Sequence, residues 1–402
     1  MNLFSLLLVF PVSLAKSHDR DYEEFKLRHI IDGKAASAAY QRSVGEVSVS
    51  SAINLMQGAP KEISRLPGLK VKVQPGSELL FQQSLSGYYS QTSADDLMPQ
   101  WLPQPDNFDT IRSFALMSAN SYEKRMLEQW RSLPDDWTDK DSFGWGGTGL
   151  RGHVFANRAE TIIVIALKGT STLLHGGETV ARDKYMDNIM FSCCCAHVDI
   201  TWTPVCGCYL GGGGEGKRCN VTCLKETIRE DDDSYYHTAL AVTHVVLARY
   251  PRAHLWFTGH SLGGALAALM AATVRRSAAI TFASPGALKY ARLLEKGLND
   301  SRPSWQLPIW NYGLSSDPIF MGTCTGLGTS CYLSGYAMET RCRHGHDCMY
   351  AISSWQPDVS THRIDWLIDN ILAKPEKYPL PSCMPVLNCT DCEQWTFNET
   401  TY

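Results

Sequence analysis

The stretch LWFTGHSLGGALAALMAATV, residues 255–274, constrains the fold more than any other part of the chain. An apolar, strand-like run leads into the sequence GHSLG, and a helix-like run rich in alanine follows it. A sharp strand-to-helix turn strains the backbone of its central residue, so the residues on either side must lack side chains. Gly259 and Gly263 meet that requirement, and the next glycine lets the helix lie close to the strand. We therefore predict that this turn exposes the Ser261 hydroxyl above a sheet.

The same five residues match the motif G-x-S-x-G, with His260 and Leu262 at its variable positions. In this setting the serine is a candidate nucleophile. The amide of Leu262, at the start of the helix, would point toward an oxyanion formed by attack on a carbonyl carbon. The alternative is an accidental match in a loop, and the strand before the motif and the helix after it argue against that.

A nucleophilic serine needs a base, and in this type of fold the acid and then the histidine follow the serine along the chain. Asp317 comes after an apolar strand candidate at 309–312 and directly before a proline. It is the candidate acid, and the alternative role for it is an Asx-turn. His362 lies in a loop just before an amphipathic helix and is the candidate base. The alternative is that His362 only caps or packs against that helix.

Two other histidines also follow Asp317 in the sequence. His344 and His346 lie in RCRHGHDC, between Cys342 and Cys348. A place in a disulfide-bonded loop explains them without any catalytic role.

The second oxyanion donor is expected in the loop after an inner strand. The run LKGT, residues 167–170, ends a buried strand where such a loop belongs. Thr170 could offer both its amide and its hydroxyl, and losing one donor of this kind costs about 3 to 4 kcal/mol of transition-state stabilisation. This chemistry requires neither a metal nor an organic cofactor.

The rest of the core alternates between strand and helix patterns. Apolar residues are spaced helically over 111–130, and GHVFANRAETIIVIALKGT at 152–170 predicts two strands joined by a tight turn at Asn157 and Arg158. The later elements are expected at 234–250 (helix), 254–258 (strand), 263–275 (helix) and 279–283 (strand). This order predicts an α/β fold in which helices cover both faces of a mostly parallel sheet.

The N-terminal part has a different composition. Residues 1–15 carry a short apolar stretch that ends in small residues, which is typical of a secretory leader and shorter than the roughly 20 residues of a membrane span. Residues 16–110 form a turn-rich extension in which prolines interrupt every candidate element, so only a short strand at 79–83 is expected. Lys and Arg (37) nearly balance Asp and Glu (41), so no strong positive field attracts nucleic acid.

Fourteen cysteines behind such a leader predict disulfides, because the secretory lumen is oxidising. Four glycosylation sequons fit the same compartment: Asn220, Asn299, Asn388 and Asn398. The alternative is a metal site formed by Cys206-x-Cys208 and Cys219-x3-Cys223. Zinc sites usually use paired C-x2-C units, so disulfides are the better prediction.

The distribution of the cysteines adds a topological prediction. Seven lie between 193 and 223, four between 324 and 348, and three between 383 and 392. If all fourteen pair, at least one bridge must leave the first cluster and one must leave the last. We therefore expect the C-terminal tail, 374–402, to be linked covalently to the body of the fold.

Some sixty residues separate Thr170 from the helix expected at 234, far more than an ordinary loop of about 12 to 15 residues. This insert, 171–233, holds seven cysteines and two apolar clusters, Leu173-Leu174 and Ile189-Met190-Phe191. We interpret it as a cap with an apolar lid that opens at a membrane surface. The alternative is a glycosylated insert without such motion.

The segments IVIALKGTS, GHSLGG, ITFASPG and NYGLSSDPI together resemble the class 3 lipases of the α/β-hydrolase fold over residues 111–373. A finer resemblance is to the autophagy-related vacuolar lipases of fungi. It is carried by HIIDGKAAS, TFASPGALKYARLLEKGL, SSDPIFMGTCTG and GYAMETRC.

The resemblance implies that Ser261, Asp317 and His362 form a catalytic triad. It also implies a lipase or phospholipase activity on membrane glycerolipids that breaks down autophagic bodies and multivesicular-body vesicles in the vacuole. Phosphoinositide binding and a single-pass signal anchor with a lumenal catalytic domain are implied as well. The apolar segment at 1–15 is short and has no preceding basic residues, which favours cleavage over anchoring.

Three functions fit these observations. The first is a serine hydrolase of lipid esters, the second a lipid-binding module without turnover, and the third a soluble esterase or peptidase on the same fold. A fold and a triad alone do not determine the substrate.

Overall fold

The computed structural model describes residues 101–398, apart from positions 126, 128, 172–177, 200, 214–215, 232, 295–302 and 353–356. The expected leader at 1–15, the strand at 79–83 and almost all of the N-terminal extension lie outside the described residues.

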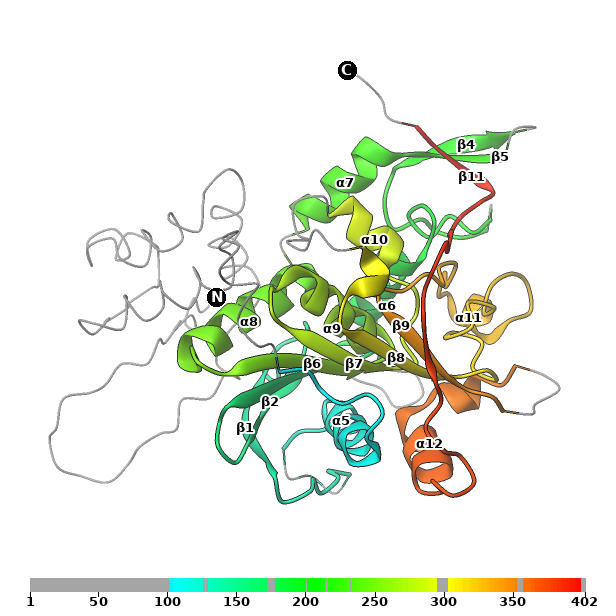
Figure 1. Cartoon of the computed structure of the whole chain (residues 1–402). Helices are drawn as coiled ribbons and strands as arrows, with labels where there is room; N and C mark the ends of the chain where they lie inside the picture. The colour runs from blue at the N-terminus through cyan, green and yellow to red at the C-terminus, as the bar shows by residue number, and fades with distance from the viewer. Residues whose placement is uncertain are drawn as a thin grey trace, which may run out of the picture.

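A central eight-stranded sheet organises the chain (Figure 1). Its strand order is β1-β2-β3-β6-β7-β8-β9-β10, in which the pairs from β3 to β9 are parallel and the outer pairs are antiparallel. The strands are β1 (Trp137–Phe143), β2 (Gly152–Asn157), β3 (Ile162–Leu167), β6 (His254–His260), β7 (Ala278–Phe282), β8 (Ile309–Leu314), β9 (His346–Tyr350) and β10 (Cys383–Pro385). The predicted α/β-hydrolase architecture with a mostly parallel sheet is confirmed.

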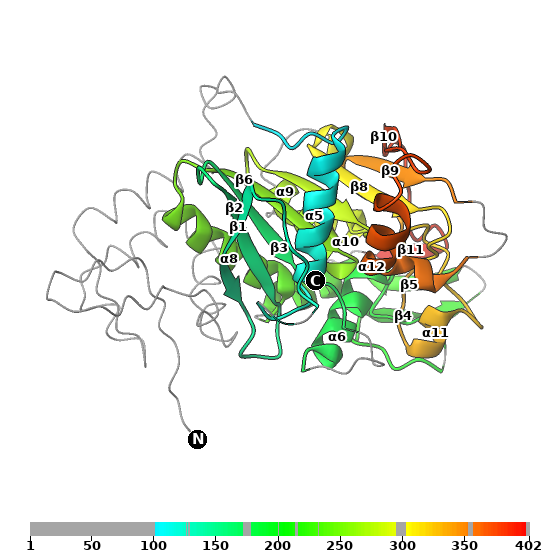
Figure 2. The ribbon, with the colours of Figure 1, turned by 90° about the horizontal axis from the view of Figure 1, so that it is seen from below.

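Both faces of this sheet are buried, as the uninterrupted apolar runs predict. Along β3, Ile163 and Ile165 face one hydrophobic core, and Val164 and Ala166 face a second core on the other side. The first core is completed by α6 (Val180–Phe191), α8 (Tyr235–Arg249), α9 (Leu262–Thr273) and α10 (Leu288–Leu293). The second is completed by α5 (Phe108–Asn120), α12 (Ile364–Leu367) and η5 (Ile368–Leu372). Figures 1 and 2 show α8 and α9 on one side of the sheet and α5 and α12 on the other.

The helix expected over 111–130 is wrong in its extent. The observed α5 begins after Asn107, whose side chain accepts a hydrogen bond from the Thr110 amide, and it ends at Asn120. The Asn120 side chain makes two hydrogen bonds of 2.8 Å with the backbone of Arg131. Eleven residues of helix would span about 16 Å, so this contact requires the chain to turn back.

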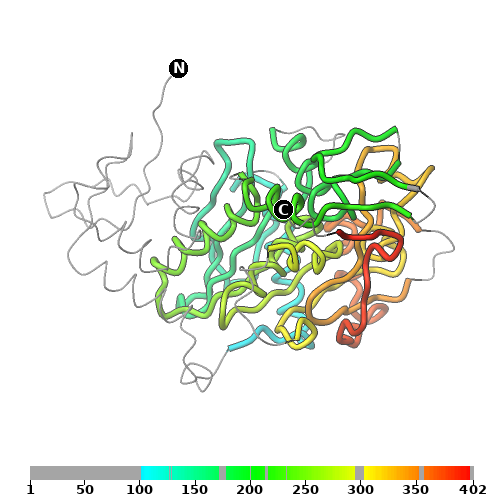
Figure 3. The backbone as a smooth tube through the Cα atoms, turned by 90° about the horizontal axis from the view of Figure 1, so that it is seen from above, coloured from blue at the N-terminus to red at the C-terminus, as the bar shows by residue number. Residues whose placement is uncertain are grey.

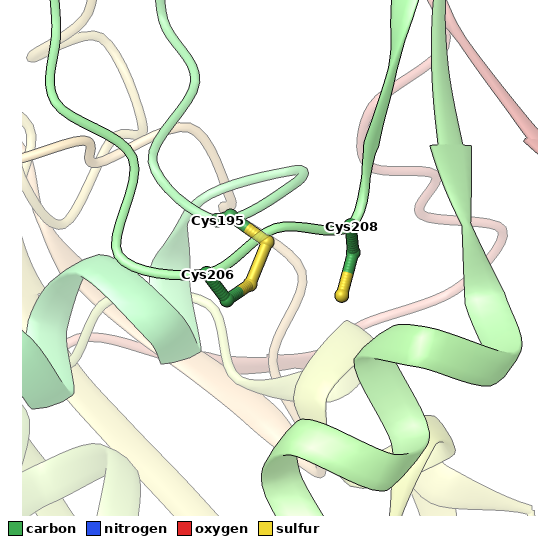
Figure 4. A group of neighbouring side chains, drawn as sticks. All are labelled: Cys195, Cys206 and Cys208. Carbon is green, nitrogen blue, oxygen red and sulfur yellow. A yellow bond between two sulfur atoms is a disulfide. The ribbon is translucent and has the colours of Figure 1, made fainter.

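The cysteine-rich insert folds around three internal disulfides. Its helices and strands are α6, the strands β4 (Tyr209–Gly213) and β5 (Gly216–Asn220), and α7 (Val221–Glu230). The disulfides are Cys194–Cys219, Cys195–Cys206 and Cys208–Cys223. The sulfurs of Cys195, Cys206 and Cys208 lie within 4.8 Å of one another, and Figure 4 shows the first two bonded together. Metals bind thiolates, so these oxidised sulfurs are cross-links rather than ligands.

The apolar cluster at Ile189-Met190-Phe191 is buried in this structure, and the opening of a lid stays a prediction. These side chains are 4%, 0% and 0% exposed and belong to the first core. They occupy the last turn of α6 and share this core with residues of β3 and β6. The other expected cluster, Leu173-Leu174, lies outside the described residues.

The C-terminal tail is linked covalently to the body, as the cysteine distribution predicts. All three of its cysteines are paired, in Cys193–Cys392, Cys342–Cys389 and Cys348–Cys383. The last strand, β11 (Trp395–Asn398), pairs in parallel with β5 and completes a second, three-stranded sheet. Figure 3 shows the red tail running back along the body toward the green insert. The tail thus holds the insert against the hydrolase domain.

The remaining helices are short and lie in the connections: η3 (Ser304–Gln306), α11 (Ser330–Ser334) and η4 (Val359–His362). Of the sequons, Asn388 is exposed, Asn220 caps α7 by accepting a hydrogen bond from the Cys223 amide, and Asn398 ends β11. Asn299 lies outside the described residues. Glycosylation at these positions stays a prediction.

Replacing both members of Cys193–Cys392 by serine should lower the free energy of unfolding more than replacing both members of Cys324–Cys331. The two bridges close loops with sequence separations of 199 and 7 residues. On the loop-entropy model, the longer loop gives about 3 kcal/mol more stabilisation. Denaturant titration without reductant measures both losses. Equal losses would show that the tail adds no long-range constraint.

Candidate active site

Ser261 has the strained backbone that the sequence predicts. It lies between the end of β6 and the start of α9, with φ 57° and ψ −128°. Positive φ is uncommon for a residue with a side chain and requires support from its surroundings. Support comes in part from the Ser261 amide, which donates a 2.9 Å hydrogen bond to the carbonyl of Phe282 on β7.

The flanking glycines are required by close backbone contacts. A Cβ on Gly263 would lie 2.1 Å from the carbonyl oxygen of Leu167 on β3. A Cβ on Gly259 would lie 2.4 Å from the backbone of Gly263, and one on Gly264 would lie 3.0 Å from the oxygen of Gly259. Each glycine therefore lets the helix, the elbow and the strand approach one another.

The structure brings together the three residues that the sequence singles out. The Ser261 Oγ lies 2.9 Å from His362 Nε2, and His362 Nδ1 lies 2.8 Å from Asp317 Oδ2. Asp317 is fully buried and Ser261 is 7% exposed. A carboxylate only accepts hydrogen bonds, so Nδ1 carries the proton and Nε2 is free to accept one from the serine. It is His362, and not His344 or His346, that occupies this place.

Asp317 and His362 are held by neighbouring residues in two loops at the same edge of the sheet. Asp317 follows β8, and its Oδ1 accepts a 2.9 Å hydrogen bond from the Ile319 amide, which orients the other oxygen toward His362. The preceding residue, Ser316, donates from its hydroxyl to Thr361 Oγ1 at 3.1 Å. The loop that carries the histidine is therefore tied directly to the loop that carries the acid.

The oxyanion candidates lie where the sequence predicts, but the threonine hydroxyl is already engaged. Leu262 is the first residue of α9, where backbone N–H groups lack partners within the helix. Thr170 lies three residues after the end of β3, and its hydroxyl donates a 2.7 Å hydrogen bond to Asp187 Oδ2. The expectation that Thr170 freely offers its hydroxyl is corrected to this extent.

Two carboxylates beneath the Thr170 loop were missed by the sequence reasoning. Asp183 Oδ2 accepts hydrogen bonds from the Lys168 ammonium at 2.9 Å, the Ser171 amide at 2.8 Å and the Thr179 hydroxyl at 2.8 Å. Asp183 and Lys168 are 1% and 4% exposed. Asp183 and Asp187 are four residues apart on α6, and that spacing, which places both on one helix face, was the signal available in the sequence.

Comparison with known proteins agrees with this geometry. The family model for the class 3 lipases matches residues 214–300. The protein named "Putative lipase ATG15" in Vanderwaltozyma polyspora is 42% identical over 306 residues, covering 74% of this chain and 53% of the relative. Its namesake in Saccharomyces cerevisiae strain S288c is 37% identical over 352 residues, covering 84% of this chain and 66% of the relative. The chain belongs to the class 3 lipase family.

This class 3 lipase chain spans about half to two thirds of the length of the curated relatives it matches. Among solved structures, the Lip2 lipase of Yarrowia lipolytica aligns with 63% of this chain and 82% of its own, at 15% identity and a TM-score of 0.33. The fold assignment depends on the strand order and the elbow rather than on that distant alignment. In the part of the chain that the structure describes, no helix is long and apolar enough to span a bilayer.

Gly263→Ala should destabilise the protein by about 1 to 3 kcal/mol, because its methyl group would overlap the backbone of Leu167. Gly146→Ala is the matched control, since a Cβ there meets nothing within 4 Å. Denaturant titration gives both free energies of unfolding. Similar values for the two variants would contradict the tight elbow.

Asp187 should make stability fall as the pH rises. Burial, reinforced by the charge of Asp183, raises the pKa of Asp187 well above its usual value. The folded protein then holds a proton that the unfolded chain releases, so stability declines as the pH rises above about 4 through the pKa of the folded state. Asp187→Asn cannot ionise and keeps an oxygen for the Thr170 hydroxyl, so its decline should be shallower.

The free energy of unfolding, measured against pH for both proteins, tests this expectation. Asp199→Asn is the control, because Asp199 is only half-buried and the Thr201 and Tyr332 hydroxyls lower its pKa. This control should keep the decline above pH 4. A decline of equal slope in Asp187→Asn would show that Asp187 is not its source.

Proposed function

We propose that this chain is a serine hydrolase that cleaves ester bonds of membrane glycerolipids. The observation that carries the proposal is the hydrogen-bonded series from Ser261 through His362 to the buried Asp317. Serine hydrolases share this arrangement whatever their sequence order. Family membership narrows the reaction to carboxylic esters.

In the proposed reaction, the Ser261 oxygen attacks the ester carbonyl while His362 Nε2 takes the hydroxyl proton. Asp317 keeps the other ring nitrogen protonated and stabilises the imidazolium that forms. The amides of Leu262 and Thr170 are placed to stabilise the oxyanion. The imidazolium then gives its proton to the departing alcohol, and an acyl-enzyme remains. Water, activated by His362, releases the fatty acid and restores Ser261.

The proposed location is the secretory pathway and, beyond it, the multivesicular body and the vacuole lumen. All fourteen cysteines of the chain pair in seven disulfides, which suits an oxidising compartment. The names of the relatives point to lipid breakdown during autophagy. Breakdown of autophagic bodies, binding of phosphoinositides and association with membranes are parts of this proposal.

Two alternatives make different predictions about substrate. A soluble esterase would hydrolyse short esters but not the lipids of vesicles. A lipid-binding module would bind vesicles without hydrolysing their lipids. The aligned triad favours turnover, because a binding module has no need for a buried acid behind a histidine.

Ser261→Ala should lower the rate of ester hydrolysis by at least about 10⁴-fold. Adding His362→Ala to that variant should cause little further loss, because the triad acts as a unit. Ser142→Ala, on the edge strand β1, is the matched control and should retain activity. Release of fatty acid from phospholipid vesicles, triacylglycerol emulsion and a short soluble ester is measured for each protein. Turnover of the short ester alone would favour the soluble esterase, and undiminished turnover in Ser261→Ala would reject the serine mechanism.

A further inference from the structure

The hydroxyl of Tyr122 lies where the loops that build the site meet. Tyr122 follows α5, far in the sequence from the triad, and is half-buried. Its hydroxyl oxygen lies 2.8 Å from His260 Nδ1. The backbone of Gly169, next to Thr170, passes close to this hydroxyl, since a Cβ on Gly169 would lie 2.1 Å from it. One hydroxyl therefore touches both the elbow and the oxyanion loop.

His260 carries this contact on to the catalytic histidine. Its Nε2 lies 2.5 Å from the backbone carbonyl oxygen of His362, and the two rings are 4.9 Å apart. A carbonyl only accepts, so Nε2 of His260 is the protonated nitrogen. A neutral ring then has an unprotonated Nδ1, which accepts the hydrogen bond from Tyr122. The Tyr122 hydroxyl therefore donates to His260 Nδ1, and His260 Nε2 donates to the carbonyl of His362.

The charge state of His260 fits this assignment. Burial, together with the nearby charge of His362, lowers the pKa of His260 to about 3. The ring is thus neutral over the pH range in which His362 would act as a base. A neutral His260 can accept from Tyr122 and donate to His362 at the same time.

His362 is consequently held at two points. Asp317 fixes its ring through Nδ1, and His260 fixes its backbone through the carbonyl oxygen. Residue 362 ends the short helix η4, so it has no long element of its own to hold it. A displacement of about 1 Å at such a position can reduce a rate by about 100-fold.

We propose that Tyr122 and His260 are positioning residues, which hold His362 within reach of Ser261 and fix the Thr170 loop relative to the elbow. This inference rests on the proposed serine hydrolase function. Neither side chain makes a hydrogen bond to the serine oxygen in the structure; both act through His362 and Gly169.

Tyr122→Phe tests the pair with the smallest change. The ring remains, including its contact with the Lys168 ammonium 5.6 Å from the ring centre, and only the hydroxyl is lost. The rate at which a fluorophosphonate labels Ser261 should fall by about 10- to 100-fold. For a short soluble ester, kcat should fall with it while KM changes little, because the binding surface for the ester is untouched.

The matched control is Tyr236→Phe. It also removes one buried tyrosine hydroxyl, which lies 3.1 Å from Thr273 Oγ1 at the far end of α9. The free energy of unfolding should fall by a similar amount in Tyr236→Phe and in Tyr122→Phe. The labelling rate of Ser261 should stay unchanged in Tyr236→Phe. At position 260, a glutamine side chain can accept a hydrogen bond from the Tyr122 hydroxyl and donate one to the His362 carbonyl. A leucine side chain can form neither hydrogen bond. His260→Gln should therefore keep most of the labelling rate that His260→Leu loses.

A second measurement separates this proposal from the proposed function. The spectrum of protein labelled with ¹⁵N-histidine should show His260 protonated at Nε2, and Tyr122→Phe should weaken that preference. If Tyr122→Phe and Tyr236→Phe label equally fast, or if glutamine and leucine at 260 behave alike, the positioning role is wrong. If wild-type Ser261 does not react but His260 has the expected tautomer, the hydrolase function fails while the hydrogen-bonded pair remains.

Discussion

The structure depends on the close approach of α9 to β3 and β6 at Ser261. Gly263 lies against the backbone of Leu167, and Gly259 lies against Gly263, so the helix can begin where the strand ends. That contact forces Ser261 into a positive φ and directs its hydroxyl away from the sheet. Because parallel strands end at one edge, the loops after β3 and β8 reach the same place and supply the oxyanion loop and the acid.

Buried polar contacts hold the loop that carries Thr170. Lys168 and Asp183 form a buried ion pair whose carboxylate also holds the Ser171 amide. A buried pair of this kind contributes little net stability, yet it fixes geometry when each of its atoms has a partner. It anchors the segment that carries Thr170, while the disulfides hold the insert and tail to the same side of the domain.

Local sequence patterns predicted the central elements because those elements are buried on both faces. The helix α9 was expected within two residues of its observed bounds, and β3 lies inside the stretch 152–170 in which two strands were expected. Edge elements were harder to predict. Among the described residues, the polar strand β1 pairs with β2 alone, and its sequence, WTDKDSF, has no apolar run that predicts a strand. The burial of the last turn of α6 depends on partners elsewhere in the chain, so its local sequence does not reveal that burial.

The sequence alone singled out Ser261, Asp317 and His362 as the candidate nucleophile, acid and base, because each requires a residue type in a local context that the chain displays. It also determined that the tail is linked to the body, since odd cysteine clusters cannot pair within themselves. Only the tertiary structure decided which cysteines pair and how Asp183, Asp187, Tyr122 and His260 surround the triad. Those contacts join residues up to 199 positions apart, so they depend on the folded arrangement of the chain and not on any local sequence pattern.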